Sequence, residues 1–255
     1  VMTPKERKRI YTLLGPQKIA EIFAYLDEPQ IYFSELSVKD AAKVVSLMDS
    51  DDAVDVLETL DDKKKYEIVE NLDKAAIKDV KMLLSYDDDE IGSCMTTNYI
   101  CIPKGLSVRQ AMSELVRQAG TNDNISTIYV LDESLKFAGA IDLKDLIIAR
   151  KHDVLDDIIV RSYPSVTDHE KIDECMEKIM DYSEDSIPVL SQDGHMLGVI
   201  TSEDIVEMVN NEMGEDYAKL AGLTAEEDLK ETTAQSMKKR LPWLIILLFL
   251  GMLAS

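Results

Sequence analysis

The chain has 255 residues, 28 basic against 49 acidic side chains, a formal net charge of −21 and 45% apolar residues. The acidic excess argues against a nucleic-acid-binding protein, whose surface should be basic, and the apolar fraction argues against general disorder. The length suits two or more domains. Cys94, Cys101 and Cys175 form no CxxC motif, and no secretory signal is recognised, so we expect free thiols and an intracellular protein.

Short amphipathic segments fill the first third of the chain. Between residues 19 and 84, apolar side chains recur at helical spacing in IAEIFAYL, AAKVVSLM, DAVDVLETL, YEIVENL and IKDVKMLL. Asp49 or Ser50, and Asp61 or Asp62, are the expected N-caps of two of these helices. Because the polar joints between them are short, we expect a superhelical stack of helices rather than a long bundle.

An internal repeat follows the polar connector SYDDDEIG (Ser85–Gly92). The segment Thr127–Ile147 aligns with Ser186–Val206 at a constant offset of 59 residues, whereas the helices upstream of them align at an offset of 64. The difference falls at TNDNI (121–125), which is therefore an insertion in the first copy. Each copy predicts an extended segment, a helix, two strands and a helix, and two copies predict a paired module with a pseudo-twofold axis.

An acidic helix is expected after the second copy. Its carboxylates are closely spaced at Asp204, Glu207, Glu212, Glu215 and Asp216. Like charges at such spacing destabilise an isolated helix by roughly 0.2–0.5 kcal/mol per pair, so two interpretations remain open: a solvated acidic face, or a cation site. Oxygen ligands favour Mg²⁺, and nothing in the spacing of His or Cys supports zinc.

The chain ends in an uncharged run, Trp243–Ala254, which follows the basic residues KKR (238–240). Twelve residues are fewer than the roughly 20 that span a bilayer, so a core helix and the first half of a transmembrane helix are the alternatives. The basic flank and the interfacial Trp favour the start of a span, with the preceding chain in the cytoplasm. TAEEDLKETTAQSMKKR (224–240) predicts a capped helix that leads into it.

Two motifs in the repeat, GAIDLKD and GVITSED, resemble the CBS-domain repeat, and a pair of copies resembles a Bateman module. The order of segments over essentially the whole chain resembles the MgtE family of magnesium channels. The resemblance implies a multidomain α+β fold with an all-α superhelical N-domain, an α/β tandem CBS module and a long connecting helix. The implied boundaries are 1–90 for the N-domain, 91–153 and 154–214 for the two CBS domains, 215–241 for the connecting plug helix and 242–255 for the start of the transmembrane helix.

The resemblance implies a non-enzymatic homodimer, joined through its CBS domains, in a multi-pass protein of the cell membrane. It further implies a cytosolic part that binds Mg²⁺ between N-domain, CBS domains and plug helix and closes the pore when Mg²⁺ is plentiful. The alternative is an adenine-nucleotide-sensing CBS module on another membrane transporter. A hydrolase is poorly supported, because no nucleophile–base arrangement is found.

The resemblance also implies specific ligands. The predicted metal ligands are the acidic residues of the acidic helix together with other residues that match acidic positions of the family. Glu207 stands where the family often has Asp. Ser183 also stands where an Asp is common, so a ligand is not expected there. The full predicted set is Glu21, Asp51, Asp55, Asp173, Asp204, Glu207, Glu212, Glu215 and Asp216.

ATP is the second ligand that the resemblance implies, in the cleft of the first CBS copy. Asp145 matches a position whose carboxylate contacts ribose in CBS proteins, Lys144 adjoins it, and Thr201 holds an equivalent place in the second copy. However, Asp142 replaces the usual Ser or Thr and would repel a phosphate, and no Gly-rich phosphate loop supports the site.

Overall fold

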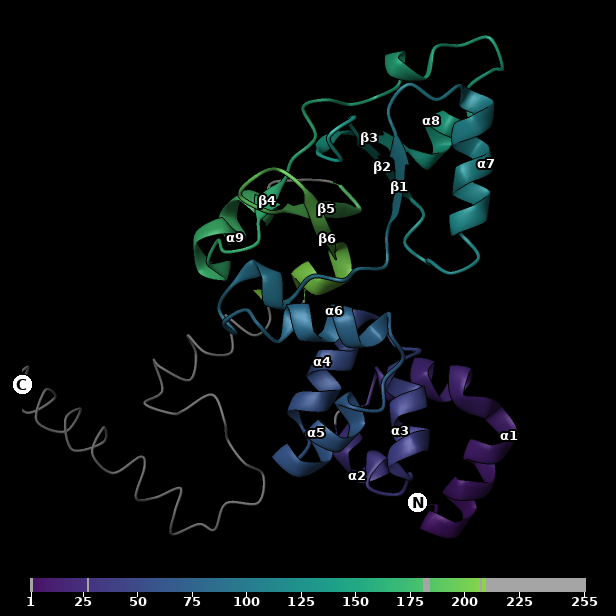
Figure 1. Cartoon of the computed structure of the whole chain (residues 1–255), viewed down its shortest axis with the longest axis vertical. Coiled ribbons are helices and arrows are strands. Elements are labelled where there is room, and N and C mark those ends of the chain that lie inside the picture. Colours follow the sequence, from purple (N-terminus) through teal and green to yellow (C-terminus); the bar gives the residue numbers. More distant parts are fainter. Residues whose placement is uncertain (1, 27, 181–183, 207, 210–255) are drawn as a thin grey trace, which may run out of the picture. The chain divides into compact units, whose positions relative to one another are not determined.

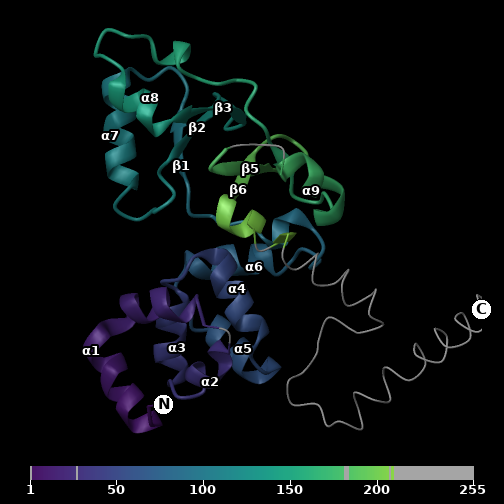
Figure 2. The same ribbon diagram turned by 180° about the vertical axis from the view of Figure 1, so that it is seen from behind.

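The computed structural model describes residues 2–26, 28–180, 184–206 and 208–209. The chain divides into two compact units, residues 1–202 and residues 203–255. Of the second unit, only 203–206 and 208–209 are described, and they are helical. The first unit holds a group of helices followed by two three-stranded sheets (Figures 1 and 2).

The helical part agrees with the periodicity of the sequence but contains more helix than was predicted. Its helices are α1 (Pro4–Phe23), α2 (Pro29–Phe33), α3 (Val38–Val45), α4 (Ser50–Glu58), α5 (Asp62–Val69) and α6 (Ala76–Leu83). The prediction began α1 at Ile19 and missed α2. The structure shows that α1 starts at Pro4, behind a Thr3–Glu6 capping box, and is kinked at Gly15. The Gly-Pro pair there interrupts the periodicity that a helix prediction needs.

A part-buried ion pair holds the first half of α1 in place. Arg7 pairs with Glu35 between α2 and α3, and Tyr11 donates to the same carboxylate at 3.2 Å. The Arg7 hydrogen bond is the main cause that lowers the pKa of Glu35. Beneath this pair, Phe23 and Phe33 pack edge to face with 5.3 Å between ring centroids, so α1 and α2 share one apolar core.

Both repeats form the predicted strands and helices. The first copy contains β1 (Ile100–Pro103), α7 (Val108–Gln118), β2 (Thr127–Leu131), β3 (Phe137–Asp142) and α8 (Leu143–Ile148). The second contains β4 (Val166–Thr167), α9 (Ile172–Met180), β5 (Ser186–Leu190) and β6 (Met196–Thr201). In each sheet the first pair of strands is parallel and the second antiparallel. Helices α7 and α8 contact each other and pack on the first sheet (Figure 1).

The two copies exchange backbone hydrogen bonds at equivalent positions. Thr96 pairs with Val199 of β6, with N–O distances of 2.8 and 2.9 Å, and Ala140 of β3 pairs in the same way with Val160. Ala140 and Val199 are 59 positions apart, and Thr96 and Val160 are 64 apart, which are the two offsets of the repeat. The segment before each copy therefore pairs with the sheet of the other copy, and this reciprocity confirms the predicted pseudo-twofold relation.

Each of these crossings needs a glycine on the strand. A Cβ atom added to Gly139 would lie 2.6 Å from the carbonyl oxygen of Val160, and one added to Gly198 would lie 2.7 Å from that of Thr96. Both contacts are with backbone atoms, which cannot swing away as a side chain can. Gly139 also has a φ of 144°, which L side chains rarely adopt.

No helix among the described residues combines the length and apolar character needed to cross a bilayer. The predicted plug helix (215–241) and the predicted start of a span (242–255) lie outside the described residues.

We predict that Gly139→Ala and Gly198→Ala each lower the free energy of unfolding by about 1–3 kcal/mol, because the added methyl group forces the crossing backbones apart. Gly120→Ala is the matched control, since its Cβ would lie 4.0 Å from the nearest atom. Urea denaturation of the three variants measures the effect, and equal stability of all three would contradict the steric explanation.

Candidate functional site

The predicted metal ligands of the helical part lie on two helices. Asp51 and Asp55 are on α4, one helical turn apart and therefore on the same side of the helix. Asp51 is half-buried in the first turn, where the helix dipole stabilises negative charge, and Asp55 is exposed. Glu21 is exposed on α1.

The remaining predicted ligands are only partly described. Asp173 is exposed in the first turn of α9, where its carboxylate accepts a hydrogen bond from the Glu174 amide at 2.8 Å. Asp204 is half-buried in the second unit. The other predicted positions, Glu207, Glu212, Glu215 and Asp216, lie outside the described residues, as does Ser183.

In the described part of the chain, no three Asp, Glu, His or Cys side chains converge as a metal-binding group. The carboxylate pair on α4 offers oxygen donors of the kind that Mg²⁺ uses, one or two per ion beside retained waters. The complete ligand set therefore stays a prediction.

The start of α4 is joined directly to the chain segment that precedes the first sheet. The Ser50 hydroxyl accepts the Thr97 amide at 2.9 Å, and the Asp49 carboxylate accepts the Asn98 side-chain amide at 2.9 Å. From α6, the Asp79 carboxylate accepts the Thr97 hydroxyl at 3.3 Å. These contacts form one wall of a cavity of about 310 Å³.

Asp49 occupies one of the predicted N-cap positions but does not cap α4 with its side chain. Its carboxylate instead bonds to Asn98, and burial raises the pKa of this carboxyl group. Asp61, by contrast, caps α5 as predicted by accepting the Lys64 amide at 3.1 Å. No sequence pattern points to Asn98, because its partner is 49 positions away and no local motif connects the two residues.

The connector pairs with the second copy rather than with the first. The amides of Ile91 and Gly92 donate to the carbonyls of Glu170 and Asp168 at 2.9 and 2.8 Å. Side chains of the same segments also pair. His169 Nδ1 lies 3.1 Å from the Glu90 carboxylate, and Lys171 Nζ lies 2.7 Å from that of Asp89. The Tyr86 hydroxyl donates to the Asp168 carboxylate at 3.1 Å. The acidic run of the connector is thus neutralised in part by residues of the second copy.

Two of the three candidate nucleotide residues, Lys144 and Asp145, lie in the first turn of α8. Asp142 is the N-cap, and its carboxylate accepts the Lys144 amide at 2.6 Å, so the acid has a structural role in place of the usual Ser or Thr. Asp145 follows in the first turn and is half-buried. Thr201 ends β6 in the second sheet and is also half-buried.

A cluster of tyrosines, Tyr129 buried and Tyr163 half-buried, links the two sheets, and no sequence pattern predicted it. The hydroxyl groups of Tyr129 and Ser186 are 2.6 Å apart, and Tyr163 donates to the Ser186 carbonyl at 2.8 Å. Tyr129 is 1% exposed, and burial raises its pKa and takes that of Tyr163 to about 12. These phenols stay neutral at physiological pH and act as hydrogen-bonding core residues.

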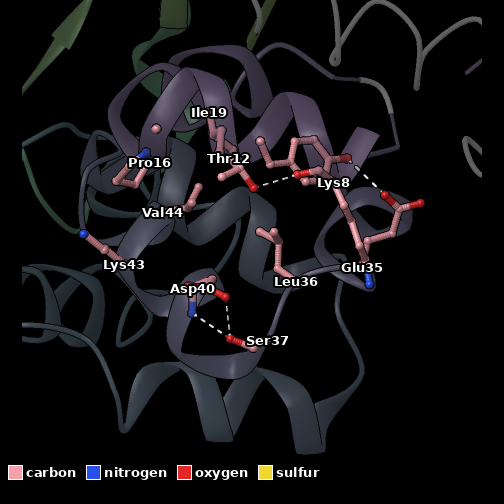
Figure 3. A pocket seen from close by; sticks show the side chains of 12 residues that line it. Lys8, Thr12, Pro16, Ile19, Glu35, Leu36, Ser37, Asp40, Lys43 and Val44 are labelled. Carbon is pink, nitrogen blue, oxygen red and sulfur yellow. Dashed lines mark hydrogen bonds between the residues drawn. The ribbon is translucent and has the colours of Figure 1, made fainter. Parts of the chain in front are cut away.

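A cavity of about 530 Å³ lies in the helical part between α1 and α3 (Figure 3). Its rim carries two lysines, Lys8 and Lys43, and two acids, Glu35 and Asp40. The Asp40 carboxylate accepts the Ser37 hydroxyl at 2.7 Å, and Glu35 is already paired with Arg7. None of the predicted site residues lines this cavity, and its balanced charges favour neither an anion nor a cation.

Comparison with known proteins identifies the families of the helical part and of the two repeat copies. Residues 1–89 match the family model described as the MgtE intracellular N domain, and residues 90–152 and 155–211 match that of the CBS domain. The Magnesium transporter MgtE of Enterococcus faecalis is 38% identical over 252 residues, which cover 97% of this chain and 55% of that relative. The chain thus spans about half the length of this relative.

Two solved structures resemble the fold. The soluble part of a magnesium transporter is 31% identical, with a TM-score of 0.79, and the match covers 83% of this chain and 84% of that one. The cytosolic domain of the Mg²⁺ channel MgtE in complex with ATP is 26% identical, with a TM-score of 0.74, over 81% and 85% of the two chains.

We predict that Asp142→Ala lowers the free energy of unfolding by about 1 kcal/mol, because α8 loses its cap, whereas Asp142→Ser retains a capping oxygen and stays close to the parent chain. Thermal denaturation of the two variants side by side tests this. If Ser destabilises as much as Ala, Asp142 does not act through the cap.

Proposed function

Since the chain belongs to the MgtE family of magnesium transporters, we propose that it is the magnesium-sensing, gate-regulating region of such a transporter. Mg²⁺ bound between the helical domain, the CBS domains and the plug helix favours the closed state of a pore. The protein that contains this region lies in the cell membrane, and the region itself is cytoplasmic. Two copies associate through their CBS domains.

The observation that carries the proposal is the extent of the similarity to a named magnesium transporter. It covers 97% of the chain, and so includes the acidic helical domain as well as both CBS copies. CBS copies alone would support any ligand-sensing module. The helical domain favours a magnesium transporter over other ligand-sensing proteins, because its family model is specific to MgtE.

The charge of the chain supplies a physical basis for sensing. With 49 acidic and 28 basic residues, surfaces of this chain that approach one another repel unless the charge is compensated. A dication held by carboxylates from two such surfaces turns the electrostatic repulsion between them into attraction. Asp51 and Asp55 on α4 are the described side chains best placed to contribute as a pair, because they share one side of the helix.

Weak individual sites suit this role. Mg²⁺ keeps several waters and usually takes one or two protein carboxylates, so each site contributes little by itself. Several sites that are complete only in the closed arrangement shift the population toward it, because only differential binding moves an equilibrium.

Adenine-nucleotide sensing is a second candidate function, favoured by one specific observation. A solved structure that is similar to this chain contains ATP. In this chain, Asp145 would accept a hydrogen bond from ribose, and Lys144 adds a positive charge at the start of α8. Asp142 opposes phosphate binding there by its charge.

We predict that Mg²⁺ slows proteolysis of the chain, and that the double variant Asp51→Asn/Asp55→Asn raises the Mg²⁺ concentration for half-protection by about fivefold or more, because two anionic ligands are lost. Limited proteolysis over a Mg²⁺ titration measures this. Glu70→Gln is the matched control, an exposed acid at the end of α5 outside the predicted set. Cleavage rates that do not respond to Mg²⁺ would refute magnesium sensing.

For nucleotides, we predict that Asp142→Ser tightens ATP binding by about fivefold, since removal of one nearby negative charge is worth on the order of 1 kcal/mol at a protein surface. Asp145→Asn should weaken binding. Calorimetric titration of both variants with ATP tests the assignment, and unchanged affinity in both would place the nucleotide elsewhere or exclude it.

A further inference from the structure

The first half of α1 is a basic segment in an acidic chain. Residues 4–14 contain four basic side chains and one acidic one, a net charge of +3, whereas the rest of the chain has 24 basic and 48 acidic side chains. The local charge is therefore opposite in sign to that of the whole protein. A basic helix that also carries apolar residues is typical of segments that lie on a membrane surface or bind an acidic partner.

The contacts of Arg7 and Tyr11 determine which side of this half-helix faces outward. Both side chains bond to the same carboxylate of the helical part. Lys5, Arg9 and Leu13 each lie two positions from one of these residues, and two positions in an α-helix turn a side chain by about 200° around the axis. They also follow one another at steps of four residues, so they form a single row on the opposite side.

This row, the outer face of α1, is accessible to solvent. Lys5 and Arg9 are exposed, and neither forms an ion pair with a residue that the structure describes. The Leu13 side chain is 85% exposed. Lys8, three positions after Lys5, is also exposed, and α1 lies at the periphery of the helical part in both views (Figures 1 and 2). The basic groups and the leucine are therefore available to a partner.

Apolar side chains continue beside Leu13. Leu14 and Ile10 line a cavity of about 170 Å³ together with Met2 and Ile22. Apart from one arginine, the lining of this cavity consists of apolar and aromatic side chains. A single exposed leucine needs no explanation, whereas contiguous apolar surface marks a site of interaction. The outer face of α1 thus combines basic groups with an apolar patch.

We propose that the outer face of α1 binds the surface of an anionic lipid bilayer. Lys5, Lys8 and Arg9 contact the lipid headgroups, and Leu13 inserts at the boundary between headgroups and acyl chains. On the proposed function this region lies next to a membrane, so the role of the contact rests on that proposal, whereas the affinity for lipid does not.

The mixture of basic and apolar groups favours a bilayer over an acidic protein surface. A partner held by charge alone would use Lys5 and Arg9 but leave Leu13 in water, whereas a bilayer offers both anionic headgroups and hydrocarbon. At physiological ionic strength, acidic groups more than about 8 Å away are largely screened and hardly oppose the contact. The one acidic residue of 4–14, Glu6, belongs to the capping box and reduces the local positive charge without reversing it.

Co-sedimentation of the 255-residue chain with lipid vesicles in EDTA tests the proposal. We expect tighter binding to vesicles of phosphatidylcholine mixed with phosphatidylglycerol than to vesicles of phosphatidylcholine alone. Lys5→Gln/Arg9→Gln should weaken binding to the mixed vesicles by about tenfold or more, since each basic residue near an anionic surface contributes about fivefold. Leu13→Gln should weaken it by about threefold or more, because the inserted apolar group is lost. The apolar run 243–254 is present in every variant and contributes equally to each.

Lys74→Gln/Lys78→Gln is the matched control, because it removes the same charge from two exposed lysines that are also four positions apart in the helical part. Tyr66→Gln is the control for Leu13, since Tyr66 is 68% exposed on α5. Every substituted side chain is exposed, so thermal denaturation of the variants should match that of the parent chain.

The parent chain decides first: equal affinity for the two kinds of vesicle overturns the proposal. It is also overturned if Lys5→Gln/Arg9→Gln binds the mixed vesicles as tightly as the lysine control. If that variant instead lowers self-association in sedimentation velocity without vesicles and leaves vesicle binding unchanged, the outer face of α1 meets an acidic surface of a second copy, and the bilayer is the wrong partner.

This proposal and magnesium sensing fail in distinguishable ways. If the chain prefers anionic vesicles in EDTA while its cleavage rates do not respond to Mg²⁺, the lipid-binding face stands and the sensor is wrong. If Mg²⁺ slows proteolysis while the chain shows no preference for anionic vesicles, the sensor stands and the lipid-binding face is wrong.

Discussion

The reciprocal crossing of the two CBS copies is the constraint on which the rest of the described structure depends. Thr96 is fixed to Val199 by two backbone hydrogen bonds, and Gly198 lets the strands approach. Thr97 and Asn98 follow Thr96 directly, so the crossing also positions the groups that receive α4. A backbone pairing between the two repeat copies therefore holds the residues that bond to the helical domain. Thr97 and Asn98 are fixed in place because they directly follow the paired Thr96.

Periodic features of the fold could be predicted from the sequence. The helical spacing predicted α3 to α6, and the constant offset of the repeat predicted both sheets and their relation. The first half of α1 and the short α2 were missed, because Gly15-Pro16 and Pro29 break the periodicity on which the prediction depends. Asn98 was missed for a different reason: a hydrogen bond between distant residues leaves no local pattern.

Composition and motif matching predicted only part of the candidate site in a form that the described structure can test. Asp51 and Asp55 lie together on α4 as a helix at these positions requires, but the partners expected from the acidic helix fall largely outside the described residues. Asp142 shows that one acid can have two interpretations. Its charge opposes phosphate, and its hydrogen bond to the Lys144 amide caps α8, so helix capping explains its presence without any ligand.

The pairing of the connector with the second copy bears on how the chain folds during synthesis. Ile91 and Gly92 bond to residues 168–170, and Thr96 bonds to Val199, so these contacts close only after about 80 to 100 further residues have been made. Helices α1 to α6 have mainly local partners and form early. Until β6 emerges from the ribosome, Thr96 has no strand to pair with, and the crossing does not yet hold the segment that carries Thr97 and Asn98. The assembly is therefore completed late in synthesis, when the second copy pairs with the segment between the helical part and the first copy.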